Sequence, residues 1–114
     1  MTSIPDRVLE LVIFKLKPGV TREELLATND ALSNWARQQP GFISREQAYD
    51  AQGDRWIDLL WWQTIEDAHA ASEAALSSES CAPMFALIDE ATIQMIHADA
   101  VIAPVHAHAA PAAA

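Results

Sequence analysis

The sequence is poor in the residues that mark several large classes of protein. Its 114 residues include one cysteine, Cys81, so no internal disulfide can form, and no second ligand lies beside it at metal-binding spacing. Lysine and arginine total 7 against 16 acidic residues, and the net charge of −9 repels both nucleic acid phosphates and anionic lipids. We therefore expect a buried, idle thiol and no nucleic acid or membrane partner.

Long apolar segments are missing as well. No apolar run reaches the roughly 18–20 residues that a membrane-spanning helix needs, and the N-terminal MTSIPDR lacks the basic stretch and apolar core of a signal peptide. These absences predict a cytoplasmic protein. The composition is ordinary for a globular chain, and the length suits one domain over residues 1–103, followed by an Ala/Pro/His-rich tail at 104–114.

The sequence does contain a regular succession of strand and helix patterns. The segment 8–17 is apolar at almost every position, which is typical of a strand covered on both faces. The predicted strands are 8–17, 42–49, 55–63 and 91–102, and the predicted helices are 21–39, 65–77 and a short one near Pro83. This βαββαβ order predicts an α+β, ferredoxin-like fold, with a four-stranded antiparallel sheet and helices on one face.

Capping and turn signals mark several element boundaries. Thr21 and Glu24 fit the S/T-x-x-E capping box at a helix start, and the Pro-Gly pair at 40–41 ends that helix. The segment 50–54 is typical of a hairpin turn, in which Gly53 is free to adopt a positive φ.

The strands at 8–17 and 55–63 are apolar on both faces, yet the helices of one chain cover only one face of the sheet. The other face needs a second protein surface, and a symmetric homodimer that closes two sheets into a barrel supplies it. Left in water, each large side chain there would forfeit about 1.5–3 kcal/mol of burial. We expect a homodimer that forms through the sheet face.

Three motifs carry a resemblance to a known superfamily over roughly residues 8–102. They are KPG at 17–19, PGF at 40–42 and the entry into the second helix at 62–68. With these motifs the chain resembles the dimeric α/β-barrel superfamily, and within it the antibiotic-biosynthesis-monooxygenase-like and stress-responsive A/B barrel domains.

The resemblance implies a function only in outline. Members include enzymes that oxidise polycyclic phenols with oxygen and no cofactor, haem-degrading enzymes, and proteins without an assigned activity. Haem degraders carry an asparagine where this sequence has Val12, so the resemblance does not extend to haem chemistry. It implies a small hydrophobic or aromatic ligand and no cofactor.

The two faces of the central strands differ in character. One set of side chains is aliphatic, and we expect it to lie under the helices. The other set has two acids among aromatic residues, and we place it on the barrel side, away from the helices. Its members are Glu10, Phe14, Trp56, Asp58 and Trp62. An aromatic wall with a few acids is typical of a small-molecule cavity.

Glu10 and Asp58 would each be costly to bury without a partner. Arg45, on the predicted strand 42–49, is a candidate partner for one of them. If the two acids are close, they titrate as a pair with one pKa raised, which gives a general base near neutral pH. The alternative is that both lie near strand ends or at the dimer seam in structural salt bridges.

The histidines and one amide have two interpretations each. His97, on the last predicted strand, is either a base or ligand in the cavity or a hydrogen-bonded core residue. His69 lies either at the helix–sheet margin or at the cavity mouth. Asn29 is either a satisfied buried amide or a donor to the ligand. His106 and His108 form an H-x-H pair, but two ligands in a tail rarely make a site, and we predict no metal.

Two hypotheses on function remain. In the first, the protein resembles a cofactor-independent monooxygenase, and His97, Asp58 or Glu10 acts as the catalytic base on a flat phenol-like substrate. The candidate substrate-binding residues are Trp56, Trp62, Phe14, Asn29, Arg45 and His69. In the second, it is a non-catalytic metabolite-binding or stress-responsive barrel. An open pocket that contains His97 or Asp58 favours the first hypothesis, and a barrel plugged by its own aromatic residues favours the second.

Overall fold

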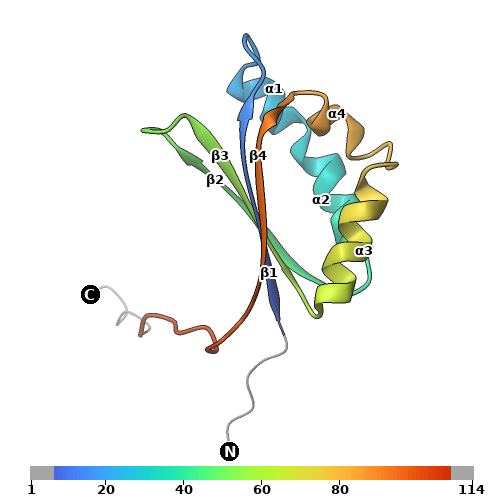
Figure 1. Cartoon of the computed structure of the whole chain (residues 1–114), viewed down its shortest axis with the longest axis vertical. Helices are drawn as coiled ribbons and strands as arrows, with labels where there is room; N and C mark the ends of the chain where they lie inside the picture. Colours follow the sequence, from blue (N-terminus) through green and yellow to red (C-terminus); the bar gives the residue numbers. More distant parts are fainter. Residues whose placement is uncertain (1–6, 109–114) are drawn as a thin grey trace, which may run out of the picture.

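The computed structural model describes residues 7–108 and has the expected α+β architecture (Figure 1). Its elements are β1 (Val8–Leu16), α1 (Arg22–Ala27), α2 (Asn29–Arg37), β2 (Phe42–Asp50), β3 (Arg55–Trp62), α3 (Ile65–Ala75), α4 (Ala82–Phe85) and β4 (Ile88–Asp99). The strands pair antiparallel in the order β2-β3-β1-β4, and in Figure 1 the helices lie to one side of this sheet. The ends of the predicted domain and tail, 1–6 and 109–114, lie outside the described residues.

The first helical segment begins as predicted but is divided in two. Thr21 Oγ1 accepts a hydrogen bond from the Glu24 backbone N–H at 3.1 Å, and Glu24 Oε1 accepts one from the Thr21 N–H at 3.2 Å, which confirms the capping box. The single helix predicted over 21–39 is wrong, because the chain leaves α1 and starts α2 at Thr28. The Thr28 hydroxyl donates to the Leu25 carbonyl at 2.6 Å, a local bond that competes with the helical ladder.

Two glycines have the positive φ that turns require, but Gly53 is not one of them. Gly19 has a φ of 84° and Gly41 a φ of 77°. In the hairpin turn, Asp54 takes the left-handed conformation, with a φ of 51°. The Gly53 N–H instead donates to Asp50 Oδ1 at 3.2 Å, so an aspartate side chain organises this turn.

The core lies between the helices and the sheet. The buried residues of α3 are all alanines, Ala68, Ala71 and Ala75, and the sheet opposite them contributes the larger side chains. Trp62 and Phe14 are among the largest fully buried side chains. Cys81 is also fully buried, in line with the expectation of a buried thiol.

This packing reverses the predicted assignment of the two faces of the sheet. The set with the acids and aromatic residues was expected on the side away from the helices, but it lies under them and is buried: Glu10, Phe14, Trp56, Asp58 and Trp62. The other set lies on the face of the sheet that no helix covers, the helix-free face, and is half-buried. It is aliphatic apart from one tryptophan: Leu9, Leu11, Ile13, Ile57, Leu59 and Trp61. The reason is volume, because the alanine-lined α3 can pack closely only against bulky partners.

The helix-free face remains apolar in the single chain. Ile96 on β4 is opposite Leu11 in the register and is half exposed. Within residues 7–108, no helix combines the length and apolar character needed to cross a bilayer.

Candidate functional site

A cavity of about 420 Å³ lies between the helices and the sheet. This volume is within the range of small-molecule sites, roughly 300–1,000 Å³. Its walls are mainly apolar, with Phe14 and Trp62 on the sheet side and Trp35, Met84 and Phe85 on the helix side. The cavity therefore suits a small hydrophobic ligand.

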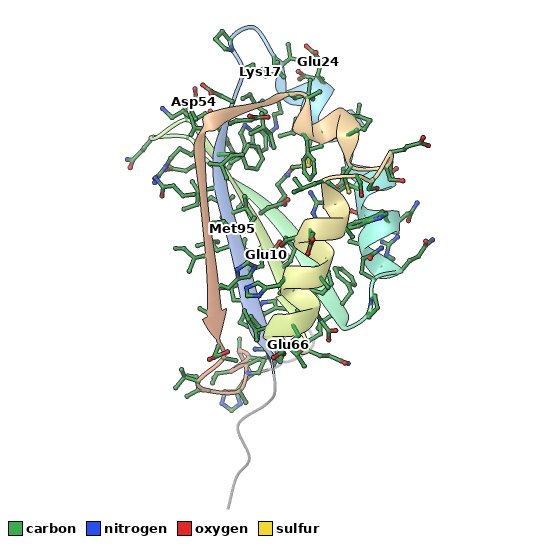
Figure 2. The ribbon with its side chains drawn as sticks, turned by 45° about the vertical axis from the view of Figure 1, so that its right-hand side comes forward. Glu10, Lys17, Glu24, Asp54, Glu66 and Met95 are labelled. Carbon is green, nitrogen blue, oxygen red and sulfur yellow. The ribbon has the colours of Figure 1, made fainter. Side chains whose placement is uncertain are left out.

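Glu10 is the polar centre of one wall of the cavity. Figure 2 shows it between β1 and α3. The Ser72 hydroxyl on α3 donates to Glu10 Oε1 at 2.9 Å, and His97 Nε2 on β4 lies 3.0 Å from the same oxygen. Since a carboxylate oxygen accepts, Ser72 and His97 both act as donors. Glu10 Oε2 has no hydrogen-bonding partner among residues 7–108 and is not sealed by its neighbours, so it is available on the cavity wall.

His97 links this carboxylate to the protein surface. Its ring packs edge-on against that of His69, with centroids 4.9 Å apart. His69 is exposed and lies at the helix–sheet margin, one of the two predicted places for it. Neither histidine lines the cavity, so His97 reaches it only through Glu10.

Asp58 lines the same cavity but is held by an ion pair. Arg45 Nη2 lies 3.1 Å from Asp58 Oδ1, and the two side chains are 5% and 8% exposed. Gln47 Nε2 also donates to Oδ1, at 3.4 Å. Burial raises the pKa of Asp58, and the charge and hydrogen bonds of Arg45 and the hydrogen bond from Gln47 oppose this rise.

The rest of the Arg45 guanidinium is also occupied. Its Nη1 donates to Asn29 Oδ1 at 2.7 Å and to Ser33 Oγ at 2.9 Å, both on α2. Asn29 is thus a satisfied amide that positions Arg45, and it does not line the cavity. The structure confirms Arg45 as the partner of one acid, and Glu10 and Asp58 each have their own partners.

The candidate tryptophans separate into two places. Trp62 lines the cavity, where its indole N–H is buried with no hydrogen-bond partner in the described part of the chain. Trp56 does not line this cavity. It lies in a second pocket of about 300 Å³ beside the 17–19 turn, where its ring is 4.7 Å from that of Tyr49.

Three residues of the site were not among the predicted candidates. Ser72 lies on the inward side of α3, and a serine in an otherwise alanine-lined stripe was the available signal. Ser33 and Met84 gave no signal, because their contacts with Arg45 depend on how the helices pack. Across residues 7–108, no group of three or more His, Cys, Asp or Glu side chains is arranged to hold a metal ion, and the exposed His106 and His108 form no such group.

Comparison with known proteins finds similarity to solved structures. No family model matches the sequence, and a search of curated proteins finds no match. SnoaB, a cofactor-independent oxygenase from Streptomyces nogalater, is 15% identical with a TM-score of 0.58, and the alignment covers 88% of this chain and 96% of SnoaB.

Two further structures are similar. A candidate antibiotic biosynthesis monooxygenase from Bordetella bronchiseptica has a TM-score of 0.68 at 14% identity, covering 85% of this chain and 99% of its own. One from Chloroflexus aurantiacus J-10-fl has a TM-score of 0.56 at 25% identity, covering 90% of this chain and 97% of its own. These similarities confirm the ferredoxin-like fold and the resemblance to antibiotic biosynthesis monooxygenase-like proteins at the level of the fold.

Proposed function

We propose that the protein is a cofactor-independent monooxygenase that acts on a flat, phenol-like substrate in the cavity between sheet and helices. The observation that supports this most is the free Oε2 of Glu10 on the wall of an otherwise apolar cavity. The presence of Asp58 in an open cavity of about 420 Å³ also favours an enzyme over a barrel plugged by its own side chains.

In the proposed reaction Glu10 is the catalytic base. Oε2 accepts a proton from the substrate, while Ser72 and His97 hold Oε1 in place. The substrate anion then gives one electron to dioxygen, and recombination of the two radicals forms a C–O bond. Glu10 returns its proton to the peroxide anion, which becomes a hydroperoxide. Cleavage of its O–O bond, with loss of the hydrogen on the same carbon, releases water and leaves a carbonyl, so that one substrate and one O2 give one quinone and one water.

The other polar candidates take supporting roles in this proposal. His97 is a positioning residue, because it touches Glu10 and not the cavity. Asp58 is the weaker candidate for the base, since Arg45 and Gln47 occupy its oxygens. Trp62 and Phe14 would contact the ring and exclude water.

We also propose that two copies assemble through the helix-free face of the sheet. The middle of that face is apolar and centres on Leu11 and Leu59, which are opposite each other in the register, while the exposed Glu46 of β2 lies beside Leu59. Covering it removes large side chains from water, which is the main favourable term in protein association. The active site would then lie on the side of each sheet away from the partner.

One observation favours a non-catalytic alternative. Arg45 is fully engaged within the protein, and Ser72 and His97 already donate to Glu10, so the cavity offers few free donors to stabilise a developing oxygen anion. In that case the protein would bind a hydrophobic metabolite, or serve as a stress-responsive barrel, without converting a ligand.

Oxygen uptake with a panel of anthrone-like phenols distinguishes the two functions. We expect Glu10→Gln to lower kcat by about 10²–10⁴-fold, the usual contribution of a general base, while ligand binding is retained. Glu73→Gln is the matched control, because Glu73 is an exposed carboxylate on α3 that does not line the cavity. Wild-type protein that binds these phenols and consumes no oxygen would support the non-catalytic alternative.

A further inference from the structure

The ionisable side chains that line the cavity are acidic, and none is basic. Its lining residues include three carboxylates, Glu10, Asp58 and Glu90, but no lysine, arginine or histidine. The buried Arg45 does not line the cavity and already bonds to Asp58, Asn29 and Ser33. His97 contacts Glu10 but does not line the cavity either. The positive charge of Arg45 therefore balances Asp58, and little of it remains for a ligand.

Glu10 then decides which polar groups of a ligand bind favourably in the cavity. Its side chain is 9% exposed, its Oε1 is occupied by Ser72 and His97, and its Oε2 has no partner among residues 7–108. An unpartnered acceptor in an apolar cavity attracts a hydroxyl or N–H donor. It repels a second anion strongly, because the surroundings screen charge poorly.

We infer that the cavity selects uncharged, flat ligands that present a hydrogen-bond donor to Glu10, and that it excludes the corresponding carboxylates. This inference rests on the proposed ligand site and specifies its substrate class. Two ring systems of equal size should then differ greatly in affinity when one carries a hydroxyl and the other a carboxylate. The mainly apolar walls would bind the ring in both cases, so the difference reports the polar group alone.

The test compares 2-naphthol, 2-naphthoate and 2-methylnaphthalene by quenching of tryptophan fluorescence at pH 7.5. We expect 2-naphthol to bind at least tenfold more tightly than 2-naphthoate, with 2-methylnaphthalene between them. Glu10→Gln should reduce the ratio of the affinities for 2-naphthol and 2-naphthoate to about threefold or less, since it removes the carboxylate charge and keeps the shape of the side chain. Glu73→Gln removes an exposed carboxylate of α3 that does not line the cavity, and it should leave the ratio nearly unchanged.

Each result has a separate meaning. Equal or tighter binding of 2-naphthoate by the wild-type protein would overturn the inference, and the proposed oxygenase would still stand if anthrones drive oxygen uptake. Failure of all three compounds to bind would overturn both the ligand site and the inference. An unchanged ratio in Glu10→Gln would show that another group sets the selectivity.

Discussion

The buried ion pair between Arg45 and Asp58 offers the most direct test of the site's construction. Replacing Arg45 with methionine removes the cation and keeps a similar apolar stem. At the observed separation of 3.1 Å, two unit charges attract by about 5 kcal/mol at an effective dielectric constant of roughly 20. Desolvation of both groups offsets much of this, but loss of one partner leaves an uncompensated buried charge, which typically costs about 3–5 kcal/mol.

We therefore expect Arg45→Met to lower the free energy of unfolding by about 3–5 kcal/mol and Asp58→Leu to have a comparable effect. The double variant should lose less stability than either single variant, because it contains neither of the two buried charges and so leaves none unpaired. Urea unfolding followed by tryptophan fluorescence measures all four proteins, at one fixed protein concentration because assembly would contribute to stability.

The pH dependence supplies a second signature of the same pair. Burial raises the pKa of Asp58 above the ordinary value of 3.8 for an aspartate. The folded state therefore binds the proton more tightly than the unfolded state, and stability falls as the pH rises from about 3.8 through the folded-state pKa. Without Arg45 the pKa rises further, so we expect the deficit of Arg45→Met to shrink as the pH is lowered from 7 towards 4.

The control is an exposed ion pair on the same sheet. Arg55 Nη2 lies 3.0 Å from Asp50 Oδ2, with the side chains 44% and 28% exposed, so Arg55→Met should change stability little. If the effects of Arg45→Met and Asp58→Leu simply add in the double variant, within about 0.5 kcal/mol, the two groups are not coupled and the reasoning is refuted.

Two further predictions concern a turn and the helix-free face. Gly41→Ala should lower the melting temperature, because an alanine in the left-handed conformation costs about 1–2 kcal/mol. The loss is larger if the Asp67 carboxylate, which an added Cβ would overlap, cannot move. An unchanged melting temperature would contradict the packing of Gly41 against Asp67. Leu11→Arg places a charge at the centre of the helix-free face and should convert a dimer to a monomer with an unchanged far-UV circular dichroism spectrum. Sedimentation velocity at micromolar concentration measures this, and a wild-type protein that is already monomeric would refute the proposed assembly.

The order of elements could be predicted because it depends on local signals. The capping box at Thr21 and the Pro-Gly pair at 40–41 act within a few residues of the chain, and the structure shows both where they were expected. The break at Thr28 was missed although it is also local. The apolar stripe continues across it, and the break is marked by the bonds from the Thr28 hydroxyl and backbone N–H to the Leu25 carbonyl.

The assignment of the two faces failed for a different reason. Alternation along a strand divides its residues into two sets but does not say which set faces the helices. Both sets of β1 and β3 are largely apolar, so hydrophobicity could not decide. The deciding quantity was the volume of the side chains: α3 buries only alanines, so the bulkier set of the sheet faces it. The alanines of this segment are visible in the sequence.

The partners of the acids required both register and packing. Arg45 could be proposed for an acid because it lies on the strand next to β3, and it pairs with Asp58. His97 reaches Glu10 because the two are opposite each other in the β1–β4 register. Further along the two strands, an irregularity between Ile13 and Lys15 changes this register. No pattern within β4 alone fixes that register.

In the proposed function and assembly, the reversal of faces separates assembly from chemistry at neighbouring residues. Glu10 points into the cavity and Leu11 to the helix-free face, so these two positions of β1 would serve different purposes. A substitution at Glu10 should therefore change turnover without changing the molecular mass, whereas one at Leu11 should change the mass first. Had the predicted assignment been correct, the cavity would lie within the dimer seam and both substitutions would disturb both properties. The two variants together thus test where the site lies, independently of which substrate it accepts.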